Sequence, residues 1–123
     1  MTVQTPDQLR RLKCVPCSGA VPAASPEEVD RQVQELIGWH ATVDRRRIFK
    51  TWTMQNFTAA IDFFQEIARL AEAEDHHPDL HLVNYRNVRI EITTHAIGGL
   101  TENDFILAAK IDRAFDEGDF SRS

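Results

Sequence analysis

The sequence predicts an α+β fold, with a four-stranded antiparallel sheet that carries helices on one of its faces. Three helical patterns and four strand patterns follow one another in the order α-β-β-α-β-β-α. Both pairs of strands are joined by turns too short for the crossover that parallel neighbours require, so each pair forms an antiparallel hairpin. A length of 123 residues is typical of one domain with one core. The other sheet face keeps charged residues, so either solvent or another subunit covers it.

The start of the chain indicates a leader followed by the first helix. We expect residues 1–24 to form an irregular leader, because repeated prolines interrupt any periodicity. The motif Ser25-Pro26-Glu27-Glu28 is a capping box with proline at the first helical position, so a helix begins there and ends at Gly38. The domain proper then extends over residues 25–118, and residues 119–123 form a C-terminal tail.

Two hairpins and two further helices complete the pattern. The strands are expected at Trp39–Val43, Arg47–Met54, Leu80–Tyr85 and Val88–His95. Asn56 begins the strongest helical pattern, and Pro78 requires it to stop. The apolar stripe of that helix comprises Ala60, Ile61, Phe64, Ala68 and Ala71. A tight turn at Arg86-Asn87 joins the last two strands, and a second capping box at Thr101–Asp104 begins the last helix.

The balance of charges argues against one broad class of function. Fourteen Lys and Arg residues against nineteen Asp and Glu residues give a net charge of −5, whereas proteins that bind nucleic-acid backbones usually carry a basic excess. No apolar run reaches the roughly 18 residues of a membrane span, and the first residues lack the apolar core of a secretory signal. We therefore expect a cytoplasmic protein that binds neither nucleic acid nor membrane.

The two cysteines, Cys14 and Cys17, form a C-x-x-C motif. One such pair is half of a zinc site, and neither a second pair nor a suitably spaced histidine completes it. A redox motif would need a strand before the pair and a helix after it, whereas Pro16 and Ser18-Gly19 indicate a loop. An ordinary loop is the favoured interpretation, with redox sensitivity and metal binding as alternatives.

Four of the five histidines lie between residues 76 and 95. His76-His77-Pro78 follows the long helix and His95 ends the last strand, and because a hairpin separates them, they are expected to meet. Glu72, one turn before His76, and Asp104, at the start of the last helix, are candidates to join them. Imidazoles titrate near neutrality and suit proton transfer.

Local structure alone also accounts for these residues. The helix dipole favours histidine at a C-terminus, Asp104 has a capping role, and Glu72 and His95 fit an exposed surface. Both interpretations stay open on the residue pattern. For a functional cluster the missing motifs narrow the chemistry, since the chain has no H-E-x-x-H, nucleophile-elbow, G-x-G-x-x-G or P-loop lysine motif. Acid–base catalysis without a metal or a covalent intermediate remains, and it suits a dehydration or a tautomerisation.

A specific combination of residues marks the second half of the chain. In order, these are Glu72, Asp75-His76-His77-Pro78, Tyr85, Val88-Ile90-Ile92, Thr94-His95, Gly99-Leu100-Thr101 and Asp104. With Gly38-Trp39, Ile48-Phe49-Lys50 and Phe57 upstream, the chain resembles the pterin-4a-carbinolamine dehydratase family over roughly residues 36–115. Leu80-His81 and the CVPC leader are similar to its plant and bacterial branch.

The resemblance implies a 4a-hydroxytetrahydrobiopterin dehydratase, a hydro-lyase that converts 4a-hydroxytetrahydropterin to quinonoid dihydropterin. It implies that the catalytic residues are His76, His77 and His95, with His76 and His95 as the proton-transfer pair and His77 mainly holding the pterin. The same histidines would bind the substrate together with Asp75, Thr93, Thr94 and Ala96. Glu72 and Asp104 would support the imidazoles. Family members need neither a metal nor an organic cofactor, and they assemble as homodimers or homotetramers.

The resemblance also carries an alternative function. Some dehydratase-like relatives serve as Rubisco assembly factors in chloroplasts or alongside bacterial α-carboxysomes, where the Rubisco large subunit would be the partner. In such a protein the three histidines would be an inherited scaffold without a catalytic role.

Overall fold

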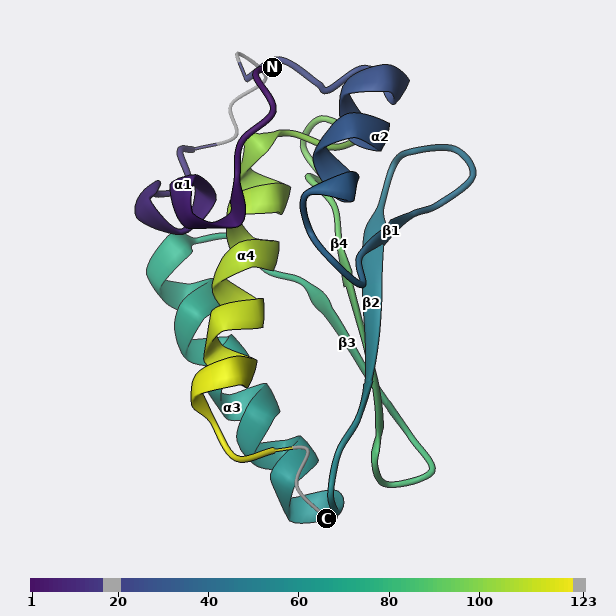
Figure 1. Ribbon diagram of the computed structural model, residues 1–123, viewed down its shortest axis with the longest axis vertical. Helices are drawn as coiled ribbons and strands as arrows, with labels where there is room; N and C mark the ends of the chain where they lie inside the picture. Colours follow the sequence, from purple (N-terminus) through teal and green to yellow (C-terminus); the bar gives the residue numbers. More distant parts are fainter. Residues whose placement is uncertain (17–20, 121–123) are drawn as a thin grey trace.

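The computed structural model describes residues 1–16 and 21–120 and contains a four-stranded antiparallel sheet with helices along one face (Figure 1). The elements are α1 (Pro6–Arg11), α2 (Pro26–Gln34), β1 (His40–Ala41), β2 (Ile48–Thr53), α3 (Phe57–Glu74), β3 (Asp79–Val83), β4 (Asn87–Ile92) and α4 (Glu102–Glu117). The strands lie in the order β1-β2-β4-β3. The predicted α+β class is confirmed. Within the described ranges, no helix has both the length and the apolar character that crossing a membrane requires.

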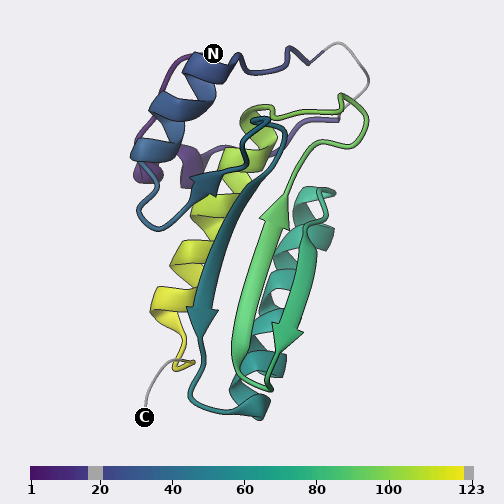
Figure 2. The ribbon, with the colours of Figure 1, turned by 90° about the vertical axis from the view of Figure 1, so that its right-hand side faces the viewer.

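The hydrophobic core lies between the sheet and helices α3 and α4, which run behind the strands in Figure 2. β4 turns Val88, Ile90 and Ile92 toward the helices, and each is at most 1% exposed, as the predicted alternation requires. On β2, Ile48 pairs with Ile92 and Trp52 pairs with Val88. The helices contribute Phe63, Ile67, Phe105, Ile106 and Ile111. The non-sequential pairing of β2 with β4 joins the two predicted hairpins into one sheet.

The expected irregular leader contains helix α1, so this prediction is wrong for residues 6–11. Thr5 and Gln8 form a reciprocal capping box, and Pro6 stands at the first helical position. Leu9 is fully buried in the core, and α1 packs against α4. The burial of Leu9 makes the start of the chain part of the folded domain.

Other boundaries also differ from the prediction: α2 ends at Gln34 and not at Gly38, and β3 covers Asp79–Val83 and not Leu80–Tyr85. β1 is limited to His40–Ala41, and β4 ends at Ile92, so the segment 93–95 lies in a loop. The hairpin turn is at Asn84 and Tyr85, both with positive φ, and not at Arg86-Asn87. Two successive left-handed residues match the right-handed twist of the flanking strands, which fixes the turn there.

The buried stripe of α3 is rotated from the predicted one. Ala60 and Ala71 are buried as expected, but Phe63 takes the central position, while Phe64 is half-buried and Ala68 is exposed. Phe63 packs edge-on against two other aromatic rings, with centroids 5.3 Å from that of Trp52 and 5.4 Å from that of Phe115. Adjacent phenylalanines satisfy the helical period almost equally, so these tertiary contacts decide which one faces the core.

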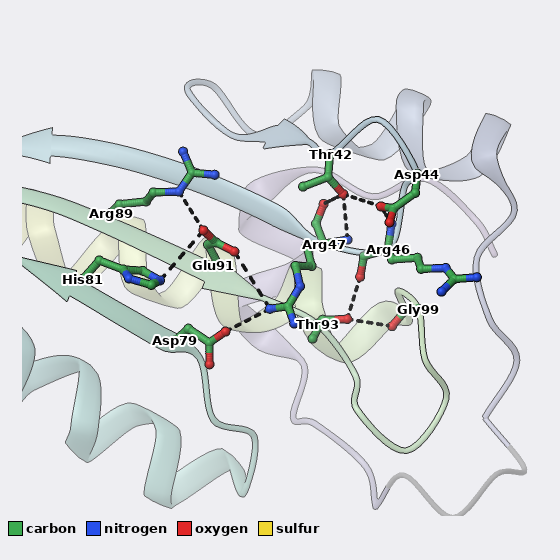
Figure 3. A network of polar contacts seen from close by, with 10 residues as sticks. All are labelled: Thr42, Asp44, Arg46, Arg47, Asp79, His81, Arg89, Glu91, Thr93 and Gly99. Carbon is green, nitrogen blue, oxygen red and sulfur yellow. Dashed lines mark hydrogen bonds and ion pairs between the residues drawn. The ribbon is translucent and has the colours of Figure 1, made fainter.

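The outer face of the sheet carries a charged network, drawn in Figure 3. Glu91 accepts a hydrogen bond from Arg89 at 2.7 Å and lies 3.8 Å from the ring of His81. Arg47 bridges Glu91, at 3.9 Å, and Asp79, at 2.9 Å. This network ties the segment before β2 to both β3 and β4.

Candidate active site

A cleft of about 720 Å³ opens where the C-terminal end of α3 meets the loop after β4. All three predicted catalytic histidines, His76, His77 and His95, line it. The predicted pocket residues Asp75, Thr93, Thr94 and Ala96 line it as well. Glu72 and Asp104 do not: Asp104 lies buried behind His76, and Glu72 lies on the exposed side of α3. The hairpin of β3 and β4 therefore brings the two histidine segments together.

The end of α3 directs neighbouring histidines to different environments. Asp75 takes a left-handed conformation with φ of 51°, and its N–H caps the helix through the carbonyls of Ala71 and Glu72. The next N–H, that of His76, returns to the carbonyl of Ala71 at 3.1 Å. This turn folds His76 under the helix, where it is 7% exposed, and leaves His77 exposed to solvent.

His76 and Asp104 form a buried pair. The Nε2 atom of His76 lies 2.6 Å from Oδ1 of Asp104, which is fully buried. The other oxygen, Oδ2, accepts hydrogen bonds of 2.8 Å from the Thr94 hydroxyl and the Thr101 backbone N–H. The carboxylate form of Asp104 can only accept hydrogen bonds, so we assign the proton of this pair to Nε2 of His76.

His77 and His95 lie on the exposed side of the cleft. His77 Nε2 is 3.5 Å from the Glu72 carboxylate, and both side chains are more than half exposed, so this pair contributes little to stability. His95 lies in a tight loop in which the N–H groups of Ile97 and Gly98 both donate to the Thr94 carbonyl. Gly98 has a φ of 71°, which permits this return. The loop fixes where His95 stands without burying it.

Two arginines that the sequence did not single out hold the edge of the cleft. Thr93 donates a 2.5 Å hydrogen bond to the carbonyl of Arg46 and a longer one, of 3.3 Å, to the carbonyl of Gly99, as Figure 3 shows. The neighbouring Arg47 binds the cleft residue Asp79. The adjacent arginines at 46 and 47 were the available signal, but their partners Thr93 and Asp79 lie far along the chain.

The leader also lines the cleft, which the sequence did not predict. Residues Lys13–Pro16 form part of its wall. Burial, and then the negative charge of Glu74, raise the pKa of the Cys14 thiol to about 12. The thiol is therefore protonated at neutral pH and is a poor nucleophile.

Neither alternative for the cysteine pair gains support from the described part of the chain. Cys17 lies outside the described residues. Among residues 1–16 and 21–120, no group of three or more His, Cys, Asp or Glu side chains is placed to hold a metal ion.

Together the fold and the cleft define a small α+β protein with a histidine-lined cleft backed by a buried carboxylate. The family model described as pterin 4 alpha carbinolamine dehydratase matches residues 22–114. The chain is 43% identical over 111 residues to a putative pterin-4-alpha-carbinolamine dehydratase of Nitrosospira multiformis, an alignment that covers 90% of this chain and 96% of that protein. This chain belongs to the pterin-4a-carbinolamine dehydratase family.

Other relatives are similar over different shares of their length. The chain is 50% identical over 103 residues to pterin-4-alpha-carbinolamine dehydratase 2, mitochondrial, of Arabidopsis thaliana, which covers 81% of this chain but only 55% of the plant protein. A transcriptional coactivator/pterin dehydratase from Brucella melitensis has a similar structure, with a TM-score of 0.71, 28% identity, and coverage of 76% of this chain and 98% of that chain.

A pterin dehydratase-like RuBisCO assembly factor of the α-carboxysome also shares the fold. The TM-score is 0.54, the identity is 19%, and the match covers 63% of this chain and 88% of that chain. At this identity the likeness concerns the fold alone.

Proposed function

We propose that this protein dehydrates a 4a-hydroxytetrahydropterin to quinonoid dihydropterin by acid–base catalysis between His76 and His95. The observation that carries the proposal is the buried pair of His76 and Asp104 at the wall of a cleft that His95 also lines. Family membership supplies the substrate class. His77, Asp75 and the Thr93–Ala96 segment would hold the pterin.

The different surroundings of the two histidines support different roles for them in the proposed reaction. Because Asp104 keeps the proton on Nε2, His76 exchanges protons through Nδ1, and the buried carboxylate stabilises the imidazolium that forms. His76 therefore accepts the proton from N5 of the pterin. The electrons of that N–H bond form the N5=C4a double bond as the 4a-hydroxyl leaves. Protonated His95, which is exposed to solvent, donates a proton to this hydroxyl, so that it departs as water.

A stopped-flow assay tests the proposal. Freshly generated 4a-hydroxytetrahydropterin is mixed with the protein, and the ultraviolet absorbance is followed against the spontaneous dehydration. We expect acceleration by the native protein and a loss of at least about a hundredfold in His95→Ala, because a positioned general acid contributes at least that much. The melting temperature should change little, since His95 is exposed.

His81→Ala is the matched control. This histidine is also about half exposed, but it contacts Glu91 on the outer face of the sheet and does not line the cleft. Its removal should leave the rate unchanged. A folded native protein that does not accelerate the reaction, or an active His95→Ala variant, would contradict the proposal.

A further inference from the structure

The leader segment Lys13–Pro16 is attached to the same two elements that carry the His76–Asp104 pair. The Lys13 ammonium donates a 2.7 Å hydrogen bond to the Ala73 carbonyl at the end of α3. The Cys14 N–H donates at 2.8 Å to Oε1 of Glu74, whose Oε2 accepts a hydrogen bond from Lys110. These contacts place the segment beside the turn from which His76 enters the cleft.

Asn103 makes the second attachment, at the start of α4. Its side chain accepts a 3.0 Å hydrogen bond from the Val15 N–H and donates a 2.7 Å hydrogen bond to the Val15 carbonyl. The Cys14 thiol lies 3.5 Å from the Asn103 carbonyl, which accepts its weak hydrogen bond. Asn103 is 2% exposed and directly precedes Asp104. A buried amide that binds both polar groups of one backbone residue holds that residue in a defined place, because leaving them unpaired is costly.

We infer that Lys13–Pro16 is a fixed wall of the cleft, held by Asn103, and that this wall limits the size of the substituent that the bound pterin carries. The inference rests on the proposed function. Carbon C6 of a pterin is bonded to N5, so a C6 substituent projects from the ring beside the atom that gives up its proton. A substituent at that position therefore contacts the wall of the cleft next to His76. Val15 and Pro16 line this cleft together with His76, and Val15 is 54% exposed.

Two substitutions test the wall in different ways. Asn103→Leu keeps a side chain of similar size but removes both hydrogen bonds to Val15, so Asn103 is tested as a positioning residue. Val15→Ala keeps those backbone hydrogen bonds and shortens the side chain at the cleft. If Asn103→Leu fails to fold, Val15→Ala still tests whether the wall limits the size of the substituent. Val43→Ala is the matched control, because Val43 is 92% exposed in the loop between β1 and β2 and lies away from the cleft.

The first measurement is amide hydrogen exchange at Val15, which does not depend on activity. We expect exchange at least tenfold faster in Asn103→Leu than in the native protein and no change in Val43→Ala. The second is the ratio of kcat/KM for two neutral 4a-hydroxytetrahydropterins, one with a methyl group and one with a dihydroxypropyl group at C6. The ratio should shift at least threefold toward the larger substrate in Asn103→Leu and in Val15→Ala.

The outcomes separate this inference from the proposed function. Equal exchange in native and Asn103→Leu proteins would overturn the role of Asn103. Normal turnover with an unchanged substrate ratio in both variants would overturn the size limit and leave the proposed function standing. A native protein that accelerates neither substrate would overturn the proposed function, and the size limit with it, while the exchange result would still decide whether Asn103 fixes the wall.

Discussion

Asp104 illustrates how one side chain serves both folding and chemistry. One of its oxygens holds His76, and the other holds Thr94 together with the first turn of α4 through Thr101. The carboxylate is fully buried, so these donors replace the water that would otherwise solvate it. The local role in helix capping and the role at the cleft are therefore performed by the same atoms, and the two interpretations of this residue that the sequence left open are compatible.

Substitution of Asp104 by asparagine tests this arrangement. The amide can still accept from Thr94 and Thr101, but its NH₂ group then faces Nε2 of His76 and forces the proton onto Nδ1. We expect the dehydration rate to fall by on the order of a hundredfold or more and stability to fall by about 1–3 kcal/mol. The measurements are stopped-flow kinetics and the ¹⁵N chemical shifts of the His76 ring, which report its tautomer.

Asp112→Asn is the control for that substitution. Asp112 is also on α4, where it binds Lys50 at 2.9 Å and the Trp39 indole N–H at 3.0 Å, away from the cleft. Its substitution should affect stability without a selective loss of rate. An Asp104→Asn variant with the native rate and tautomer would show that the carboxylate does not orient His76.

At the scale of elements, the residue that ends α3 has a strained backbone conformation and also lines the cleft. Asp75 occupies the left-handed region, which costs a residue with a side chain about 1–2 kcal/mol relative to glycine. We predict that Asp75→Gly raises the free energy of unfolding by about 0.5–1 kcal/mol, since the greater freedom of glycine in the unfolded chain offsets part of the gain. Urea denaturation measures this change, and the same variant should lose activity because Asp75 lines the cleft.

Tyr85→Gly provides the comparison. Tyr85 is also left-handed, with φ of 57°, but it lies in the turn between β3 and β4, far along the hairpin from the cleft. Both variants should gain stability, and only Asp75→Gly should lose rate. A loss of stability in Asp75→Gly would mean that the aspartate side chain contributes more than the strain costs.

The sequence predicted the features that neighbouring residues determine. It did not predict the features that depend on contacts between residues far apart in the chain. The alternation of Val88, Ile90 and Ile92 predicted the buried face of β4, and the pairing of the last two strands predicted that His95 and His76 share one cleft. The choice of Phe63 over its neighbour depends on rings from β2 and α4, which no periodicity contains. The capping box that begins α1 is present in the sequence at Thr5, but the prolines of residues 1–24 favoured the prediction of an irregular leader.

At the scale of the whole molecule, Glu74 links the leader to the domain and makes that link depend on pH. Burial alone would raise the pKa of its carboxyl, but hydrogen bonds from Lys110 and from the Cys14 N–H outweigh this, and the pKa is lowered. The carboxylate therefore stabilises the folded protein above the ordinary pKa of about 4.5, and this contribution is lost as the pH falls through the lowered value. Lys110, Lys13 and Cys14 are titratable groups that lie beside it.

We predict that Glu74→Gln destabilises the protein at pH 7 and that this effect becomes smaller as the pH falls through the lowered pKa of the native carboxyl. Thermal unfolding of both proteins over a series of pH values from 7 downward measures the difference. Glu72→Gln is the control, because this glutamate lies on the same helix with a side chain that is 78% exposed, and its effect should be small throughout the series. An effect of Glu74→Gln that does not change with pH would exclude the charge as the cause.

The attachment of the leader determines when during synthesis the cleft is completed. The Cys14 N–H bonds to a residue 60 positions later, and the Val15 N–H to one 88 positions later. The wall is synthesised before the start of α4, and contacts between residues so far apart in the chain form late. Until then His76 lacks Asp104, and the Cys14 thiol lacks the covering that keeps it protonated. A nascent or truncated chain that stops before residue 103 therefore exposes a cysteine of ordinary reactivity, which the finished protein conceals.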